Sequence, residues 1–324
     1  ATFSTWDTNN DGVFSKWKGK TADDKNIDLI PDVLVGRLPC RNKSEVKIMV
    51  NKIIDYETKT SGKAWFKNVI GIAGDTYPDE KSIFEGEVDV KNSLEKLKDF
   101  NLTFFFSSDN SLQSNSVSKI IEKLNEGCGF FILAGHGTPL FWHTHPYKNE
   151  EKLAKLTLSE INLLKNKDRY PICVCSACNI SQFDTNPFNQ LKNPKLSRDK
   201  KFDYGVKCWS WALTSKKDAG AIATIGSTGL VYLKWDKETG GKTDAWSYIL
   251  PRFFYEYAKN KTDILGEIWG NVIKNYLEKF PIDWNTPSIC YDSKSPKDGA
   301  INARTVQEFI LFGDPTLKIG GYEY

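Results

Sequence analysis

The sequence predicts an α/β protein with a largely parallel central sheet that helices cover on both faces. Strand-like and helix-like segments alternate from about residue 65 to residue 320. Several short, unbroken apolar runs are bounded by Gly or Pro, and residues 129–134 and 171–175 are the clearest examples. An unbroken apolar strand is covered on both faces, which is typical of a parallel sheet.

The predicted elements follow in chain order. Residues 1–35 are polar and loop-like, with a dense acidic stretch. An amphipathic helix over 42–59, capped by Asn42 or Ser44, has an apolar stripe of Val46, Met49, Val50, Ile53, Ile54 and Tyr56. Strands are predicted over 33–35, 69–73, 102–106, 129–134, 171–175, 220–225 and 309–312. Further helices are predicted over 85–100, 117–125, 158–164, 208–214, 246–259 and 264–279.

The composition is that of an ordinary globular protein. The chain has 324 residues, of which 40% are hydrophobic and 26% are charged, so there is ample material for a core. Its 44 basic and 41 acidic side chains leave a net charge of +3, which gives no electrostatic case for nucleic-acid binding. No apolar stretch is long enough to span a bilayer. The seven cysteines are odd in number, so at least one thiol is free.

Two of the apolar runs lead directly into reactive side chains. One is followed by His136, which stands between two glycines, and the other by Cys178. Ligands of open α/β sheets bind outside the carboxyl ends of the strands, so this histidine and cysteine are a candidate catalytic pair. A neighbouring imidazole can hold a cysteine as a thiolate or take its proton. The backbone N–H groups of Gly137 and Cys178 would then form an oxyanion hole.

Two other interpretations of these residues, in which His136 and Cys178 are not catalytic, stay open. The pair is alternatively a buried thiol and a strand-end histidine with ordinary partners. His143 and His145 could also form a mixed zinc site with Cys173 and Cys175. The spacing of these two cysteines points both to one face of an apolar strand, which favours a place in the core.

Acidic residues near another strand extend the candidate site. Asp75 follows a predicted strand, as the histidine and the cysteine do, and can orient or charge-stabilise an imidazole. Glu85, Glu87 and Asp89 begin the next helix. They are either exposed acids favoured by the helix dipole or part of a pocket for a cationic side chain.

The N-terminal stretch resembles the first half of a calcium loop. Asp7, Asn9 and Asp11 place side-chain oxygens at alternate positions before Gly12. The position of the closing glutamate holds Lys18, so a later acid would complete the ligand shell. The candidates for that acid are Asp23, Asp24, Asp28 and Asp32. The alternative is a solvated loop of Asx turns.

Six strings, spread over nearly the whole chain, carry a family resemblance. They are Pro31–Pro39 (PDVLVGRLP), Lys52–Glu57 (KIIDYE), Gly135–Thr138 (GHGT), Ser176–Cys178 (SAC) with Phe183, Ala221–Thr228 (AIATIGST) and Phe312–Leu317 (FGDPTL). In order and spacing they resemble the gingipain family of cysteine peptidases, which belongs to the caspase-like group.

The resemblance implies a caspase-like three-layer fold. Residues 1–64 would form a partial N-terminal subdomain, and residues 65–324 the catalytic subdomain. It also implies that His136 is the general base and acid and that Cys178 is the nucleophile. Asp75 falls where the family carries an acid beside the histidine, although gingipains usually have a Glu there.

The same resemblance implies residues for substrate and metal binding. Glu87, with Glu85 beside it, falls near the acid that forms the floor of the S1 pocket in Arg-cleaving members. Tyr232 would lie near an aromatic wall of that pocket, and Thr138 of the GHGT string is a further substrate contact. Calcium is usual in the family, which supports a structural ion held by Asp7, Asn9, Asp11 and Asp28.

Two features depart from the family pattern. The family generally has Gly three residues after the nucleophile, where this chain has Ser181, and this position affects the turn that carries the oxyanion donors. Family members also have strands before the Asp32 segment. We therefore expect a missing pro-segment or N-terminal piece.

The sequence thus predicts a cysteine endopeptidase that cleaves proteins or peptides, prefers Lys or Arg at P1, and is secreted or displayed on the cell surface. No nucleic-acid partner and no membrane span are expected. The main alternative is a catalytically impaired peptidase fold kept for binding or adhesion. A zinc protein is the third candidate.

Overall fold

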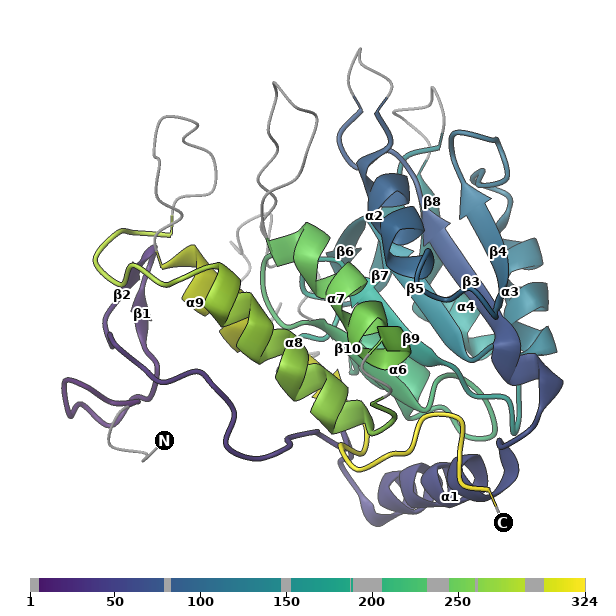
Figure 1. The fold of residues 1–324 in the computed structure, drawn as a ribbon, viewed down its shortest axis with the longest axis horizontal. Helices are drawn as coiled ribbons and strands as arrows, with labels where there is room; N and C mark the ends of the chain where they lie inside the picture. The colour runs from purple at the N-terminus through teal and green to yellow at the C-terminus, as the bar shows by residue number, and fades with distance from the viewer. Residues whose placement is uncertain are drawn as a thin grey trace.

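A six-stranded sheet forms the centre of the structure (Figure 1). The computed structural model describes residues 6–78, 83–146, 153–186, 188, 206–231, 245–259, 262–288 and 300–323. The strands are β3 (Asn68–Ala73), β4 (Asn101–Phe106), β5 (Phe130–Ala134), β9 (Ile172–Ser176), β10 (Ala223–Ser227) and β11 (Phe309–Phe312). Their order is β11-β10-β9-β5-β3-β4, and all neighbours are parallel except β10 and β11. The predicted, largely parallel sheet is confirmed.

Helices cover both faces of this sheet, because successive strand residues point to opposite sides. One face packs on the α7 layer, which consists of α2 (Glu85–Leu94), α7 (Ala245–Lys259) and α8 (Leu265–Lys279). The other packs on the α3 layer, which consists of α3 (Val117–Glu126), α4 (Leu158–Asn162) and α6 (Trp209–Thr214). The predicted three-layer α/β fold is therefore confirmed (Figure 1). Among the described helices, none is long and apolar enough to cross a membrane.

Several short elements were not predicted from the sequence: five strands of two to four residues, which are too short to show a recognisable alternation, and one helix of eight residues. They are the antiparallel pair β1 (Trp17–Lys18) and β2 (Thr21–Ala22), the antiparallel sheet of β6 (His136–Thr138), β7 (Phe141–Thr144) and β8 (Ala154–Thr157), and the helix α9 (Ile301–Glu308). β6 follows β5 after the single residue Gly135, so the second sheet begins at the carboxyl end of a central strand.

The strand predicted over residues 33–35 is wrong. Val33 and Val35 are 68% and 66% exposed, and the segment pairs with the sheet only where Arg37 bridges Phe312. An extended apolar segment becomes a strand only where a neighbour satisfies its backbone groups. The helix predicted over 85–100 is also shorter, because α2 ends at Leu94 and turns follow.

The first long helix, α1 (Lys43–Lys59), confirms the prediction over 42–59. The side chain of Asn42 caps it by accepting the backbone N–H of Glu45 at 3.0 Å. The predicted apolar stripe is wrong in part. Its buried members are Met49, Ile53 and Tyr56, and its exposed members are Val46, Val50 and Ile54.

The buried face of α1 also holds a charged residue, Lys52. Its Nζ donates to the carbonyl oxygens of Thr214 at 2.9 Å, Ala219 at 2.8 Å and Ala221 at 2.7 Å. These three bonds attach α1 to the loop between α6 and β10, and they satisfy carbonyl groups that water does not reach. Burial lowers the pKa of Lys52 to about 7, and Asp218 opposes this shift.

Residues from both predicted subdomains share hydrophobic clusters. Ile53 and Tyr56 of α1 pack within the α7 layer. Ile27 and Leu29 pack with Trp284, which follows α8. The boundary at residue 64 stays a prediction.

Lys52→Met should destabilise the protein, because it leaves buried carbonyl groups without a donor. We expect a loss of about 3 kcal/mol in the free energy of unfolding, since each unsatisfied buried polar group costs about 1–3 kcal/mol. Denaturant unfolding measures this, with Lys47→Met on the exposed face of α1 as the matched control. Equal stabilities of the two variants would contradict the role of Lys52.

The same pair of variants tests the pH dependence. Because the pKa of Lys52 is lowered to about 7 on folding, the unfolded chain binds this proton more tightly. The stability of the wild-type protein should then gain a contribution as the pH rises above about 7, and Lys52→Met should remove that contribution.

Candidate active site

Three neighbouring strands, β3, β5 and β9, end at the same level of the sheet. Ala134 of β5 is the partner of Ala73 on one side and of Ser176 on the other. The residues two positions beyond these partners are Asp75, His136 and Cys178. Because neighbouring strands lie about 4.8 Å apart, these three positions meet at one edge of the sheet.

Gly137 brings the histidine segment against the cysteine segment. A Cβ atom at position 137 would lie 2.3 Å from the carbonyl oxygen of Cys178 and 2.9 Å from the Cβ of Ala177. Only glycine permits two backbones to approach so closely. The candidate nucleophile and the candidate oxyanion donor are therefore neighbours in space.

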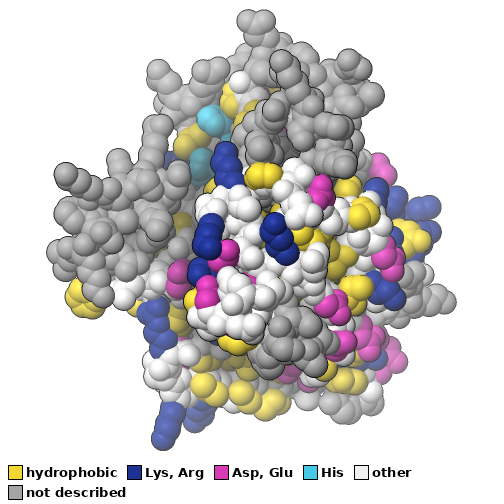
Figure 2. Space-filling view, turned by 90° about the vertical axis from the view of Figure 1, so that its left-hand side faces the viewer, with side chains coloured by type: hydrophobic (Ala, Val, Ile, Leu, Met, Phe, Trp, Pro, Cys, Tyr) yellow, Lys and Arg dark blue, Asp and Glu magenta, His cyan; other side chains and the backbone are white. Residues whose placement is uncertain are grey.

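The imidazole of His136 is held on three sides. Its Nε2 lies 2.7 Å from the carbonyl oxygen of Thr76. The Tyr77 ring meets it edge-on with centroids 5.5 Å apart, and the His143 ring stacks on it at 5.3 Å. A carbonyl oxygen only accepts, so Nε2 carries the proton and the neutral ring keeps Nδ1 as an acceptor. Histidine side chains are visible at the surface in Figure 2, and His136 itself is partly exposed.

His143 faces His136 across the pair of strands β6 and β7. Burial, together with the smaller effects of the nearby His136, His145 and Lys155, lowers the pKa of His143 to about 3. His143 is therefore uncharged near neutral pH. It stacks on the ring of His136 without placing a positive charge beside it.

The segment that follows β10 runs beside the cysteine turn. The N–H of Val231 donates to the Sγ of Cys178 at 3.3 Å, and the N–H of Asn179 donates to the carbonyl oxygen of Gly229 at 2.7 Å. The thiol of Cys178 in turn donates to the carbonyl oxygen of the same residue, Val231, at 3.7 Å, so both backbone groups of Val231 contact the sulfur. Cys178 is partly exposed and packs against the α7 layer.

Ser181 fits its place without backbone strain. Asn179 has a positive φ of 53°, whereas Ser181 does not have a positive φ. The hydroxyl of Ser181 donates to Oγ of Ser210 at 2.8 Å, and its N–H donates to the carbonyl oxygen of Ser227 at 2.9 Å. Its Oγ lies 2.6 Å from where a Cβ at Gly226 would stand, so the serine uses space that the glycine leaves.

Asp75 lies at the predicted level, and its backbone is fixed by neighbouring groups. Its carbonyl oxygen accepts the N–H of His145 at 3.3 Å and the hydroxyl of Thr144 at 3.2 Å. The described contact to the His136 imidazole comes from the next residue, through the carbonyl oxygen of Thr76. No sequence signal marks such a residue, because every residue type carries a backbone carbonyl. The role of the Asp75 side chain stays a prediction.

Glu85 and Glu87 are only 6% and 2% exposed, so their interpretation as exposed acids at a helix end is wrong. Glu85 accepts the backbone N–H groups of Thr76 at 3.2 Å and Tyr77 at 3.4 Å. It thereby holds the loop that contacts His136. Glu87 accepts the N–H of Ser108 at 2.9 Å and its hydroxyl at 2.5 Å. Burial raises the pKa of Glu87, and the bonds from Ser108 lower it in part.

Of the two other predicted substrate contacts, Thr138 and Tyr232, only Thr138 lies among the described residues. Thr138 stabilises the turn between β6 and β7, where its Oγ1 accepts the N–H groups of Leu140 and Phe141, each at 3.2 Å. Tyr232 lies outside the described residues.

The candidate calcium ligands are engaged in other contacts. Asp7, Asn9 and Asp11 accept backbone N–H groups within their own loop, and the ammonium of Lys16 contacts Asp11. Asp28 accepts a backbone N–H of its own segment. No group of three or more acidic, histidine or cysteine side chains suited to a metal occurs in the part of the chain that is described. This arrangement does not fit a bound cation unless Lys16 leaves Asp11.

The same search includes the zinc alternative, whose four residues are all described. Cys173 and Cys175 lie in the core beside the α3 layer, and burial raises the pKa of both thiols. Cys178 packs on the opposite face. The prediction that the strand cysteines belong to the core is confirmed.

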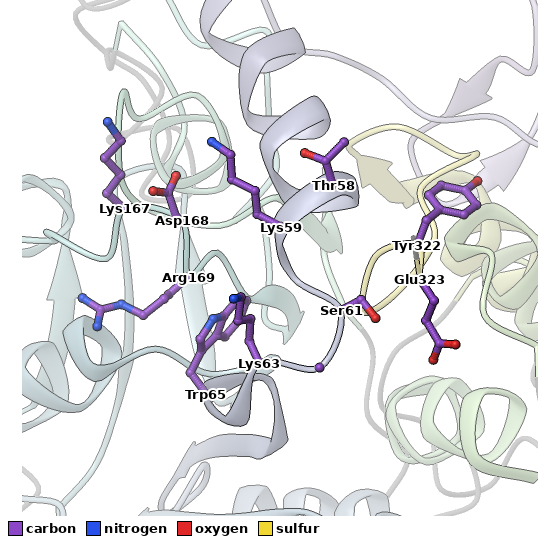
Figure 3. A pocket seen from close by; sticks show the side chains of 11 residues that line it. Thr58, Lys59, Ser61, Lys63, Trp65, Lys167, Asp168, Arg169, Tyr322 and Glu323 are labelled. Carbon is purple, nitrogen blue, oxygen red and sulfur yellow. The ribbon is translucent and has the colours of Figure 1, made fainter.

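A cavity of about 910 Å³ lies away from this site (Figure 3). It is lined by the turn before β3 and the loop before β9, so it is at the amino ends of strands whose carboxyl ends carry the histidine and the cysteine. Its charged side chains are Lys59, Lys63, Lys167, Asp168, Arg169 and Glu323. None of the predicted site residues lines it.

A thiol, an imidazole acceptor and two backbone N–H groups at one sheet edge are the chemical equipment of a cysteine peptidase. The model of Peptidase family C25 matches residues 2–320. The chain therefore belongs to peptidase family C25, the gingipain family. The predicted resemblance is confirmed.

Curated relatives are distant and longer than this chain. Lys-gingipain of Porphyromonas gingivalis is 24% identical over 203 residues, which are 62% of this chain and 10% of that protein. An uncharacterized protein of Archaeoglobus fulgidus is 28% identical over 219 residues, which are 63% of this chain and 48% of that protein. The chain thus spans half or less of the length of these relatives.

Solved structures show the same fold. The Arg-specific cysteine proteinase gingipain R has a TM-score of 0.64 at 16% identity, covering 94% of this chain and 61% of that one. The complex of the RgpB pro- and mature domains from Porphyromonas gingivalis has a TM-score of 0.61 at 17% identity, covering 94% of this chain and 62% of that one.

Gly137→Ala should displace Cys178, because the new methyl group would overlap the backbone of the nucleophile turn. We expect alkylation of Cys178 by iodoacetamide to slow by about 100-fold, because the displaced thiol would lose the nearby base that takes its proton. Peptide mapping measures the rate. Gly270→Ala is the control, because its Cβ would have 3.8 Å of room. Unchanged alkylation in Gly137→Ala would show that the two segments do not constrain each other.

Proposed function

We propose that this chain is a cysteine endopeptidase in which Cys178 is the nucleophile and His136 is the general base and acid. The observation that supports it best is the shared level of the two residues at adjacent strand ends, with Gly137 in backbone contact with Cys178. The hydrogen bond from Nε2 of His136 to the Thr76 carbonyl also supports the proposal, because it leaves Nδ1 available to accept the proton of Cys178.

The proposed reaction has two halves. Nδ1 of His136 takes the proton of Cys178, and the thiolate attacks the scissile carbonyl carbon. The N–H groups of Gly137 and Cys178 stabilise the oxyanion. The protonated imidazole gives its proton to the leaving amine, and the C–N bond breaks. Water then attacks the thioester, releases the acid product and restores the thiol.

Asp75 is the proposed third member of the site. Its position two residues beyond the end of β3, at the level of His136, would let its carboxylate stabilise the imidazolium that forms during the reaction. The Thr76 carbonyl would fix the imidazole ring, and Glu85 would fix the loop that carries this carbonyl. The proposed contribution of Asp75 to catalysis is therefore electrostatic.

For substrate choice we propose Lys or Arg at P1. Relatives named Lys-gingipain and Arg-specific gingipain R support this class of side chain. Glu85 and Glu87 place two acidic side chains on α2, and Glu85 holds the loop of Thr76 and Tyr77 beside His136, which supports a pocket for a basic side chain. Thr138 and Tyr232 are the further proposed contacts.

The binding-module alternative has less support. The feature that could favour it is Ser181, which stands where the family generally has Gly. Ser181 has an unstrained backbone and a buried hydroxyl that is hydrogen-bonded to Ser210, so its presence does not argue for a damaged nucleophile turn.

We also propose that the chain is secreted or displayed on the cell surface, acts on proteins or peptides, and belongs with a pro-segment or an N-terminal piece. The supporting observations are its family and the likeness to a complex of pro- and mature domains. Calcium remains a proposal for the loop of Asp7, Asn9 and Asp11, with Asp28 as the fourth ligand.

A panel of fluorogenic peptides that differ only at P1 tests activity and specificity together. The wild-type protein should cleave the Lys or Arg peptides, and Cys178→Ala and His136→Ala should lose activity by at least about 10³-fold. Cys40→Ala, which removes a partly exposed thiol elsewhere, is the control and should retain activity. Equal cleavage at all P1 residues would refute the basic preference.

Covalent labelling shows whether Cys178 is reactive even if none of the chosen peptides is cleaved. A peptidyl chloromethyl ketone should modify Cys178 in the wild-type protein and fail to do so in His136→Ala. Absence of labelling under reducing conditions would favour the binding module.

Calcium should raise the midpoint of thermal unfolding if the N-terminal loop binds it, because a ligand that binds only the folded state stabilises it. Asp7→Ala should abolish the effect, and Asp263→Ala, at an ion pair with Lys318, should not. The same midpoint in excess calcium and in a chelator would exclude the site.

A further inference from the structure

Helix α9 ends beside the segment that contacts the nucleophile. The backbone carbonyl of its last residue, Glu308, accepts the N–H of Thr228 at 2.7 Å and its hydroxyl at 2.9 Å. Thr228 stands three residues before Val231, whose N–H donates to the sulfur of Cys178. A helix far along the chain is thus attached to the wall of the site.

The carboxyl group of Glu308 occupies the place of a side chain at position 229. A Cβ at Gly229 would lie 2.5 Å from both Cδ and Oε1 of Glu308. Gly229 accepts the N–H of Asn179, the residue after Cys178, at 2.7 Å. A single glycine therefore separates this carboxyl group from the nucleophile turn.

The two carboxyl oxygens of Glu308 differ in their surroundings. Oε1 lies 3.4 Å from Nε of Arg304, whereas Oε2 is buried without a hydrogen-bond partner among the described residues. Burial raises the pKa of Glu308 to about 8, and Arg304 is the charged group that opposes this shift. A buried carboxylate with one weakly placed partner is costly. Ionisation therefore favours movement of the group out of the space beside Gly229.

We propose that Glu308 is a positioning residue: uncharged, it packs against Gly229 and holds residues 228–231 beside Cys178, and its ionisation releases them. This inference rests on the proposed peptidase function, in which the place of the sulfur decides the rate. It adds an ionisable group outside the His136, Cys178 and Asp75 set.

Glu308→Gln tests the inference, because the amide keeps the shape of the acid and stays uncharged. In the wild-type protein kcat/KM should fall as the pH passes about 8, and in Glu308→Gln this fall should be absent. The plot of the Cys178 alkylation rate by iodoacetamide against pH should change slope at the same pH in the wild-type protein. This change of slope should be absent in Glu308→Gln. Glu267→Gln, an exposed change of the same charge on α8, should keep the wild-type profiles.

Gly229→Ala is a second, independent variant. Its methyl group would displace the carboxyl group, and we expect about a 100-fold loss of kcat/KM, because a shift of about 1 Å in a reacting group has that effect. Identical pH profiles in wild type and Glu308→Gln, or full activity in Gly229→Ala, would overturn the positioning role. If no peptide is cleaved while the change of slope in the alkylation rate still depends on Glu308, the proposed function fails and the positioning role stands.

Discussion

The shared level of β3, β5 and β9 is the constraint on which the site depends. Each strand reaches the carboxyl edge in register with its neighbour, so Asp75, His136 and Cys178 meet although about 100 residues separate the first from the last. The register in turn depends on the two helical layers. Successive side chains of a strand pack against opposite helical layers. A shift of any strand by one residue would turn each of its apolar side chains to the wrong face of the sheet.

Around the reactive pair, backbone groups do most of the positioning. The Thr76 carbonyl sets the tautomer of His136, and Glu85 holds the N–H groups of the same loop. Gly137 lies against the backbone of Cys178, and Gly229 holds Asn179. The absence of a Cβ at these glycines matters as much as any side chain, because it lets loops from different strands approach one another.

Much of this could be predicted from residue pattern. Apolar runs identified the strands, and the residues that follow them identified His136 and Cys178. The patterns failed where an outcome depended on a partner. Val33 and Val35 look like a strand, but none of the described strands lies beside them. Glu85 looks like an exposed helix acid but is buried against a loop from the end of β3.

By itself, the sequence determined the α/β class, the order of most central strands and helices along the chain, and the choice of His136 and Cys178 as the candidate reactive residues, because these follow from local periodicity and from which residues stand at strand ends. Only the tertiary structure decided which groups surround them. The Thr76 carbonyl, the stacked ring of His143 and the carboxyl group of Glu308 reach the site from separate segments, and no local pattern records a contact between residues distant in the chain.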